Sequence, residues 1–309
     1  MGITIMIKNK VLTVLLFVFL PSFIFAQNGE VKSFYPDKTI EKIENYENGK
    51  LDGVSKYFTN DGIISEIIYY KNGIKNGPSI TYYPDGIIKE YFVIKNGKYN
   101  GAYRKYSEIG SLEEKGFYAN GIIEGEYLIY FDTGELKAKY FLENGKKVGK
   151  SYEYFKNGNI KVEATFVNGL QQEITKWFYE DGSLKSEWNY LQGNLHGKGI
   201  EYYSDGSVKA EKFFANDMQD SLETNYYEDG TVKSKIHYEN GWKEGTSKSF
   251  YEDGTLWTEQ NYLNNRLNGE TKIYRKDGSL WYIETYKSGE LINTKEYDES
   301  GKLISDKDY

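Results

Sequence analysis

The stretch ENGKKVGKS, residues 143–151, is the part of the sequence that comes closest to a phosphate-binding loop. Such a loop has four residues between its two glycines and then Lys followed by Ser or Thr, so that backbone N–H groups can surround the phosphates. Gly145 and Gly149 have only three residues between them. The same glycine pair recurs without Lys-Ser as Gly97/Gly101 and Gly121/Gly125. The segment therefore indicates a repeated turn rather than a nucleotide site.

Other residue types that could perform chemistry do not form a recognisable site. His196 and His237 have no cysteine or second histidine at ligand spacing, so they predict neither a metal centre nor a general base. The Asp-Gly pairs lack the spaced series of oxygen ligands that calcium requires, and turn formation explains them. Adjacent acids such as Glu113 and Glu114 are ordinary in so acidic a chain. We therefore predict no catalytic residue, no metal ion and no cofactor, and a protein that is not an enzyme.

Composition narrows the classes of partner. The chain has 309 residues, 39 Lys and Arg against 46 Asp and Glu, and a formal net charge of −7. Phosphate binding needs a basic face, so nucleic acid is not expected as a partner. The absence of cysteine excludes disulfides and thiolate metal sites. With 31 tyrosines, 32 glycines and only 4 prolines, the composition favours strands joined by tight turns.

Residues 1–26 have the layout of a secretory signal peptide. Lys8 and Lys10 precede the apolar run VLTVLLFVFLPSFIF, and the small residue Ala26 follows it. The run is shorter than the roughly 18 residues expected of a membrane-spanning helix. We therefore expect cleavage near Ala26 and export to the periplasm, the outer surface or the extracellular space. An uncleaved membrane anchor is the alternative.

A period of 24 residues dominates the rest of the chain, and a fixed period of this kind indicates a repeat architecture. We number each unit from one glycine column, called position 0: Gly62, Gly86, Gly110, Gly134, Gly158, Gly182, Gly206, Gly230, Gly254 and Gly278, with Gly301 after 23 residues. An aromatic residue occupies position −4, an aliphatic residue position +2, and a large apolar residue position +8 in almost every unit. Because +2 and +8 have the same parity, they share one face of a strand.

The turn residues complete the predicted unit of two strands. The Asp-Gly at position 0 suits a three-residue loop whose last residue is left-handed, which places −4 opposite +2. The Asn-Gly at +10 and +11 suits a primed two-residue turn. A third glycine column, at position −9, is predicted to be a bulge with one extra residue that restores the facing of the next aromatic. Glu173 replaces glycine there, so that unit is predicted to be looser. A weaker copy with Phe34, Ile40 and Tyr46 predicts an N-terminal capping segment over 27–48, ahead of the array over 49–309.

These residues resemble the MORN repeat in its bacterial variant form. The phrases YKNGIKNG, FLENGKKVG and YENGWKEG, each followed by text like YYxDG, carry the resemblance over about residues 34–305. It implies an all-β, elongated antiparallel meander of about eleven tandem hairpin units, with a scaffold or binding role. Some family members are described as antitoxins and others as membrane-associated assembly proteins.

The leading functional hypothesis is an exported scaffold that binds a protein partner or an envelope component. A carbohydrate- or cell-wall-binding module is one alternative, since aromatic stripes suit sugar rings. An antitoxin or immunity-type protein that neutralises a toxin is another. Peripheral contact with a membrane also stays open.

The side chains that vary along the array are the best guide to a binding site. Position +3 is usually lysine and position +5 often glutamate, which predicts a charged outward face. Near the C-terminus Trp257 and Trp281 take the lysine position. Position −3 holds a second aromatic stripe that includes Tyr251, and Trp242 lies in a nearby turn column. Exposed clusters of large aromatics mark contact sites, so Trp242, Tyr251, Trp257 and Trp281 are the candidate partner-binding residues, with packing beneath the last repeats as the alternative.

Overall fold

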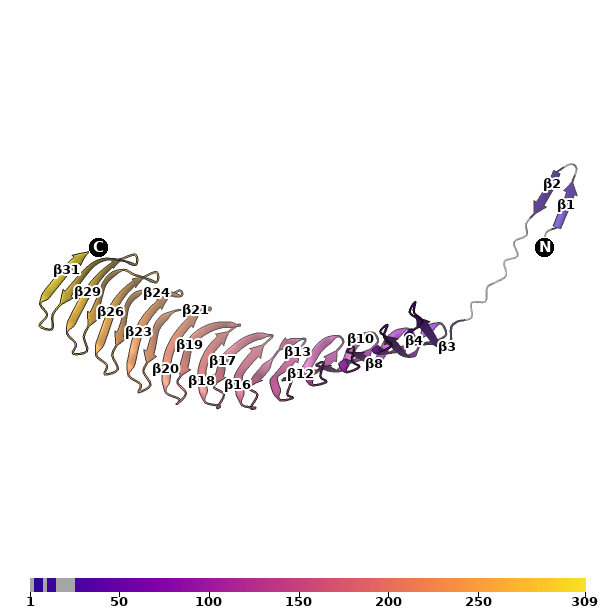
Figure 1. The fold of residues 1–309 in the computed structure, drawn as a ribbon, viewed down its shortest axis with the longest axis horizontal. Coiled ribbons are helices and arrows are strands. Elements are labelled where there is room, and N and C mark those ends of the chain that lie inside the picture. The colour runs from indigo at the N-terminus through magenta and orange to yellow at the C-terminus, as the bar shows by residue number, and fades with distance from the viewer. Residues whose placement is uncertain (1–2, 8–9, 15–25) are drawn as a thin grey trace.

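The computed structural model describes residues 3–7, 10–14 and 26–309, and within these ranges all regular secondary structure is β. The predicted signal peptide lies largely outside the described residues; inside it, β1 (Ile3–Ile7) pairs with β2 (Lys10–Val14). All later strands form one open antiparallel sheet in which each pairs with its neighbours along the chain, and the sheet is long and curved (Figure 1). The predicted all-β meander of tandem hairpins is confirmed.

The strands of the array alternate between the two halves of each unit. Long strands that leave the Asp-Gly loops are β4 (Ile40–Glu47), β7 (Ile64–Lys71), β9 (Ile88–Lys95), β11 (Leu112–Ala119), β13 (Leu136–Glu143), β16 (Ile160–Val167), β18 (Leu184–Leu191), β20 (Val208–Ala215), β23 (Val232–Glu239), β26 (Leu256–Leu263), β29 (Leu280–Lys287) and β31 (Leu303–Asp308). Unbroken strands that approach these loops are β3 (Gly29–Phe34), β8 (Ile74–Tyr82), β10 (Lys98–Tyr106), β12 (Ile122–Tyr130), β17 (Leu170–Phe178), β19 (Asn194–Tyr202) and β30 (Glu290–Tyr297). In the other units the approaching strand is divided in two, as β5 (Lys50–Leu51) and β6 (Gly53–Phe58), β14 (Lys146–Lys147) and β15 (Gly149–Tyr154), β21 (Met218–Gln219) and β22 (Ser221–Tyr226), β24 (Trp242–Lys243) and β25 (Gly245–Phe250), and β27 (Arg266–Leu267) and β28 (Gly269–Tyr274).

The loop of the Asp-Gly hairpin and its −4/+2 pair have the predicted geometry, but the register shifts by one residue beside them, since Tyr57 pairs with Glu66. Position +2 therefore does not share a face with +4 and +8, and the prediction that +2 and +8 lie on one face is wrong. In the β6–β7 hairpin, Gly62 has φ of 79° and donates its N–H to the carbonyl of Thr59 at 2.9 Å, so three residues form the loop. Phe58 at −4 lies directly opposite Ile64 at +2, and the same pairing of −4 with +2 recurs from Phe34–Ile40 to Tyr297–Leu303. The chain therefore holds one register through all its units, including the N-terminal segment 27–48.

The Asn-Gly turn is primed as predicted, because Asn72 and Gly73 both have positive φ, of 52° and 83°. The bulge that follows differs from the prediction. Lys71 pairs with Ile74, whereas Ile68 pairs with Ser79, so the returning strand carries two extra residues around Gly77 rather than one. The last unit alone has one extra residue, since Tyr286 pairs with Leu291 and Thr285 with Asn293. This missing residue explains why Gly301 follows after 23 residues.

Because the bulge adds two residues, it shifts the register but leaves side chains on the same face of the sheet. The prediction that the aromatic at position −4 points to the inward face is therefore wrong. Positions −7, +4, +6 and +8 share one face, which we call the inner face because most of the buried residues lie there. Buried members include Ser55, Ile68, Ser79, Ile94, Ala138, Ser151, Ala164, Thr175, Ser186, Ala210, Ser247 and Thr271. Positions −8, −6, +3, +5 and +7 form the outer face, and the aromatics at −4 lie half-buried at the strand ends.

The inner face is packed by pairing large with small side chains across neighbouring strands. Trp188 lies opposite Gly199, and a Cβ atom at Gly199 would come within 2.1 Å of the indole ring. Gly116 makes the same room for Tyr127, whose ring would lie 2.7 Å from an added Cβ. Because the sheet is a single layer, these contacts within one face replace the second layer that an ordinary domain supplies.

Hydrogen bonds join successive units at both edges of the sheet. At the Asn-Gly edge, Gly73 donates its N–H to the carbonyl of Leu51 at 2.7 Å, and Asp52 Oδ2 accepts from the N–H of Asn72 at 3.0 Å. Equivalent bonds recur along the array. The described residues contain no helix that is long and apolar enough to cross a membrane.

Candidate binding sites

The second aromatic stripe, at position −3, ties each unit to the next. The Tyr203 hydroxyl donates a hydrogen bond to the carbonyl oxygen of Tyr226 at 2.8 Å, 23 residues along the chain. The same bond is made by the hydroxyls of Tyr35, Tyr83, Tyr179, Tyr227 and Tyr251. These tyrosines therefore have a structural role at the Asp-Gly edge of the sheet.

The lysines at +3 lie over this stripe. Lys233 Nζ is 5.3 Å from the centroid of the Tyr227 ring, and Lys185 Nζ is 5.5 Å from that of Tyr179. Lys89, Lys137 and Lys209 lie over their −3 rings in the same way. A cation within about 6 Å of a ring face is attracted to it. Positions −3 and +3 thus act as a pair in each unit.

At the C-terminal end the residue types at positions −3 and +3 change. Trp257 replaces the lysine and lies 5.8 Å, centroid to centroid, from Tyr251. In the next unit the two types are exchanged: Arg275 occupies −3, and its Cζ lies 5.1 Å from the centroid of Trp281. Trp281 also stacks on Tyr282, with centroids 4.9 Å apart. Trp257 is 47% exposed and Trp281 39% exposed, so both indoles offer surface as well as packing.

The four candidate residues do not form one cluster. Tyr251 and Trp257 lie together, and Trp281 lies one unit further along the same edge. Trp242 follows the Asn240–Gly241 turn and so lies at the opposite edge of the sheet. It is 51% exposed and borders a shallow pocket of about 230 Å³ with Leu263, Arg266 and Asn268. Sequence proximity placed Trp242 near the others, whereas the length of a strand separates them.

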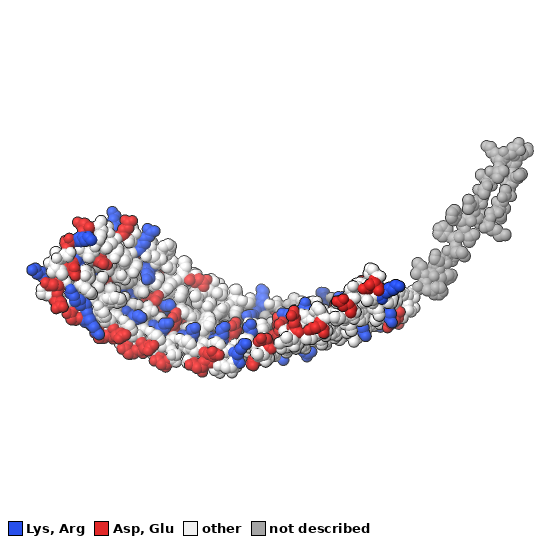
Figure 2. Space-filling view, viewed as in Figure 1, with Lys and Arg blue, Asp and Glu red and all other residues white. Residues whose placement is uncertain are grey.

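The outer face carries rows of ion pairs that link positions −6 and −8 with +5. Lys176 lies directly opposite Glu187 with Nζ 3.3 Å from the carboxylate, and Lys248 lies opposite Glu259 at 2.9 Å. Lys295 faces Asp306 at 4.0 Å in the last hairpin. From −8, Lys198 reaches Glu211 at 2.8 Å. Basic and acidic side chains are correspondingly intermixed over the array (Figure 2). The predicted charged outward face is present, with the glutamates paired to −6 and −8 rather than to the +3 lysines.

One hairpin breaks this pattern. At the same −6 and +5 positions of the β10–β11 hairpin, Arg104 lies directly opposite Lys115. Neither side chain makes an ion pair in the described part of the chain; each instead lies near a ring, Arg104 over Tyr91 at 5.6 Å and Lys115 over Tyr130 at 6.0 Å. Like charges directly opposite each other on one face of a sheet are destabilising.

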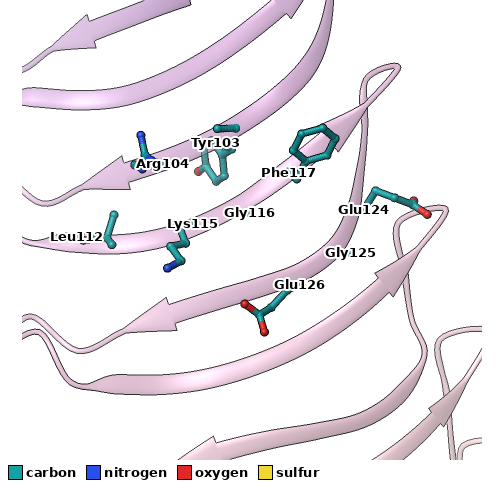
Figure 3. A pocket seen from close by; sticks show the side chains of 10 residues that line it. Tyr103, Arg104, Leu112, Lys115, Gly116, Phe117, Glu124, Gly125 and Glu126 are labelled. Carbon is teal, nitrogen blue, oxygen red and sulfur yellow. The ribbon is translucent and has the colours of Figure 1, made fainter.

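The two cations border an open depression of about 540 Å³. Its lining comes from three consecutive strands, β10, β11 and β12 (Figure 3). Phe117 at +7 contributes a phenyl ring that is 48% exposed. Two carboxylates at the rim are already engaged: Glu126 pairs with Lys139 at 2.5 Å, and Glu124 accepts from the N–H of Asn144 at 2.8 Å. The pocket therefore combines two cations that form no ion pair in the described residues with an exposed aromatic ring.

This pocket was not predicted from the sequence. The signal was nonetheless in the columns, because Lys115 occupies the position that holds Glu163, Glu187, Glu211 and Glu259 in later units. Arg104 and Lys115 stand out only when the residues that face each other across a hairpin are compared. That comparison needs the register, which shifts by one residue beside the loop at position 0, between Lys105 and Tyr106.

The inner face beneath the same strands holds a half-buried carboxylate that accepts several hydrogen bonds. Glu114 accepts hydrogen bonds from the Tyr127 hydroxyl, from Lys105 Nζ at 3.2 Å and from the Tyr103 hydroxyl at 3.4 Å. Burial acts to raise the pKa of Glu114, but the hydrogen bonds from Tyr127 and Lys105 outweigh it and hold the pKa below its usual value. Burial together with Glu114 raises the pKa of Tyr127, so its hydroxyl stays protonated and donates. The arrangement fixes side chains rather than activating one.

The other groups that could carry chemistry have structural roles or lie in separate hairpins. Gly145 in the loop-like segment donates its N–H to the carbonyl of Ile123 at 3.2 Å, within the sheet edge. Asp205 accepts from the N–H and the hydroxyl of Ser207, at 2.9 and 2.6 Å, which lowers the pKa of Asp205. His196 and His237 are exposed and belong to different hairpins. In the described residues no group of three or more His, Asp or Glu side chains is arranged to hold a metal ion.

The fold and its columns define a tandem β-hairpin repeat protein. The sequence model of the family described as "MORN repeat variant" matches residues 27–48, 51–72, 147–168, 174–192, 195–216, 219–240, 243–264 and 267–288, which together exceed half of the chain. The chain belongs to this family. The longest unmatched part inside the array is 73–146, which contains the pocket of Arg104 and Lys115.

Other comparisons add no specific relative. No curated protein matches the chain. Solved structures with partial likeness include "Crystal Structure of TcdB2-TccC3", at 13% identity, a TM-score of 0.19, and coverage of 85% of this chain and 17% of that one. The Photorhabdus luminescens Tc holotoxin pore matches at 10% identity, a TM-score of 0.20, and coverage of 90% and 17%. This chain thus spans less than a fifth of the length of either structure.

Proposed function

We propose that this protein is a non-enzymatic scaffold, exported from the cytoplasm, whose repeat array binds a protein partner at the cell envelope. The observation that supports the proposal is the contrast between positions that repeat and positions that vary. Inner position +8 carries a large apolar residue in every unit from Tyr70 to Tyr286. Outer position +5, by comparison, holds an isoleucine, a tyrosine, a lysine or an acidic residue in different units. A surface that varies along an otherwise regular frame is suited to recognising an extended partner.

Exposed aromatic rings add contact area to this surface. Phe117 and Phe141 on the outer face are each 48% exposed, and Trp242, Trp257 and Trp281 are exposed at the two sheet edges. Tryptophan and other large aromatic side chains are prominent in protein interfaces because they bury much area at a small entropy cost. Export is supported by the signal-like sequence of residues 1–26.

The proposal is tested with the mature chain, beginning at Gln27, immobilised and incubated with solubilised envelope of the source cell. A specific partner should be cross-linked, and after purification it should bind the array saturably. A glycan array run in parallel tests the carbohydrate-binding alternative, and rescue of cells from a co-expressed neighbouring toxin tests the immunity alternative. Retention of glycans with no protein partner would contradict the proposal.

A further inference from the structure

The hairpin of β10 and β11 is electrostatically unlike the others of the array. Where the −6 and +5 side chains are both charged in other hairpins, they have opposite signs, as in Lys176–Glu187, Lys248–Glu259 and Lys295–Asp306. Arg104 and Lys115 occupy these positions with the same sign. A glutamate at 115 would form the ion pair seen elsewhere, so this hairpin forgoes a local stabilisation. Such a departure from an otherwise repeated pattern is expected where a ligand supplies the missing charge.

The surroundings of the pair show which chemistry would complete it. The carboxylates of Glu124 and Glu126 are engaged elsewhere. Glu113, two residues from Lys115 on the outer face, pairs with Lys105 at 3.2 Å. None of these three carboxylates forms an ion pair with Arg104 or Lys115. The exposed ring of Phe117 lies two residues from Lys115 on the same strand face, and Ala102 lies opposite it. A carboxylate between the two cations and an apolar side chain against Phe117 would satisfy both features at once. Arg and Lys are the residues that bind carboxylates most strongly.

We propose that this pocket, formed by Arg104, Lys115 and Phe117 on the outer face, binds an acidic segment of a polypeptide partner through a carboxylate flanked by an apolar residue. The inference rests on the proposed function, since it identifies where and how a protein partner engages the array. A polypeptide fits better than an anionic membrane, because the depression across three strands suits side chains rather than a flat lipid surface.

The same pocket lies within residues 73–146, the part of the array that the family description does not match. Backbone register continues unchanged through this part, as the pairing of Tyr106 with Leu112 and Tyr130 with Leu136 shows. The difference from the other units is therefore one of side chains. Side chains that depart from the repeat without altering the backbone are those that give one unit its own binding specificity.

The test uses the full array and a fluorescein-labelled acidic peptide in which Asp and Glu alternate with Phe and Leu. A matched peptide carries Asn and Gln in place of the acids. Binding is followed by fluorescence anisotropy at low and high salt. Lys115→Glu should weaken binding of the acidic peptide by about tenfold or more, because it replaces an attraction by a repulsion. The same variant should unfold at or above the temperature of the unaltered protein, because it replaces two like charges by an Arg–Glu pair equivalent to the Lys–Glu pairs of other hairpins.

Lys235→Glu is the matched control. Lys235 occupies the same +5 position on the outer face of another unit, so this variant changes the net charge by the same amount. Lys235 lies opposite Thr224 within its hairpin and opposite Lys248 on the next strand, and Lys248, unlike Arg104, is already paired with Glu259. The control variant should leave peptide affinity unchanged. Lys115→Gln, which removes the charge without adding a repulsion, provides a second measurement if Lys115→Glu proves unstable. It should lower affinity by a smaller factor.

The outcomes separate the site from the wider function. The proposed site is overturned if Lys115→Glu binds the acidic peptide as tightly as the unaltered protein. It is also overturned if Lys235→Glu lowers the affinity for the peptide as much as Lys115→Glu does. Binding to phosphatidylserine vesicles that depends on Lys115, with no binding of the peptide, also overturns it in favour of a membrane. If a purified envelope partner binds the Lys115→Glu variant as well as the unaltered protein, the scaffold function stands and the site does not. If the peptide binds through Lys115 but the envelope yields no partner, the site stands and the proposed function fails.

Discussion

Arg275 lies over the indole of Trp281, with its Cζ 5.1 Å from the ring centroid, while its Nη2 donates a hydrogen bond to the carbonyl of Tyr297 at 2.6 Å. In earlier units a tyrosine at −3 makes the bond to the next unit and a lysine at +3 supplies the cation. Here the cation and the ring have changed places, and one guanidinium performs both tasks. The pair at −3 and +3 is therefore a structural link that tolerates exchange of its two partners.

This relationship predicts different results for the same change at two tryptophans. Trp257→Lys should alter the free energy of unfolding by less than about 0.5 kcal/mol, because it recreates beside Tyr251 the Tyr–Lys pair of upstream units. Trp281→Lys should destabilise by about 1–2 kcal/mol, because it removes the cation–π contact and places a second cation beside Arg275. Thermal unfolding and hydrogen exchange of the C-terminal units measure both. Similar stability losses in the two variants would contradict the paired role of −3 and +3.

The position −3 hydroxyl offers a second test of how units are joined. Tyr203→Phe should destabilise by about 1 kcal/mol, since the carbonyl of Tyr226 loses its side-chain donor. The ring itself is tolerated, because Phe131 and Phe155 occupy this position in other units. The reverse change, Phe155→Tyr, should stabilise by a similar or smaller amount through a new bond to the carbonyl of Phe178. Chemical denaturation of both variants measures these changes. Changes of the same sign in the free energy of unfolding would contradict the hydrogen bond between units.

Much of this fold is predictable from the sequence because its information is local and repeated. Asp-Gly and Asn-Gly turns fix two loop geometries, and the alternation of −4, +2 and +8 identifies strands. The number of extra residues in the bulge is not predictable in this way. A glycine at −9 indicates positive φ, as at Gly77 with 135°, but does not show how many residues the partner strand passes over. The predicted pairing across each Asn-Gly hairpin was therefore displaced by one residue, and the one-residue shift beside the Asp-Gly loops was not predicted.

The candidate sites were predictable to a lesser degree for a related reason. Trp257 and Trp281 lie on the expected edge, but Trp242 belongs to the other edge, and only the strand length between the two turn types separates them. Tyr251 was grouped with them as an exposed ring, whereas its hydroxyl is bonded to the carbonyl of Tyr274 at 2.9 Å. The pocket of Arg104 and Lys115 depends on which residues face each other, which is a property of register and not of composition.

Glycine at position 0 is expected to be required for conformation alone. Gly206 has φ of 88°, and a Cβ atom added there would meet no heavy atom within 4 Å. Gly206→Val should still destabilise by about 1–2 kcal/mol, because a β-branched residue resists positive φ. The loss should stay within the neighbouring hairpins, as contacts in a repeat array are local. Hydrogen exchange that accelerates evenly over the whole chain would contradict this locality.

At position −9, Glu173 stands where most units have glycine. It was predicted to loosen its unit, but the register of β16–β17 shifts as in other units and Glu173 itself adopts φ of 63°. A non-glycine residue in this conformation is strained, so Glu173→Gly should stabilise by about 0.5 kcal/mol after the entropy of glycine in the unfolded chain is subtracted. Gln172→Gly, next to it with a negative φ, should destabilise. Urea denaturation of the two variants gives the comparison.

Glu114 predicts how the stability of the central units depends on pH. Hydrogen bonds from Tyr127 and Lys105 overcome the effect of burial and keep the pKa of Glu114 below the value of about 4.3 expected in the unfolded chain. A carboxyl group whose pKa is depressed by folding stabilises the folded state above its unfolded pKa and loses this contribution as pH falls through the folded pKa. The stabilisation should therefore be complete above about pH 5 and decline progressively below about pH 4.

Comparison of the unaltered protein with Glu114→Gln isolates this contribution from those of the turn aspartates, whose pKa values are also lowered. The difference in unfolding free energy between the two proteins should be largest near pH 7 and shrink toward pH 3, because the protonated carboxyl group then resembles the amide. Tyr127→Phe should show the same reduced pH dependence, since it removes a principal donor to the carboxylate. A difference that stays constant from pH 7 to pH 3 would show that Glu114 stabilises the sheet by packing, and that its charge contributes nothing.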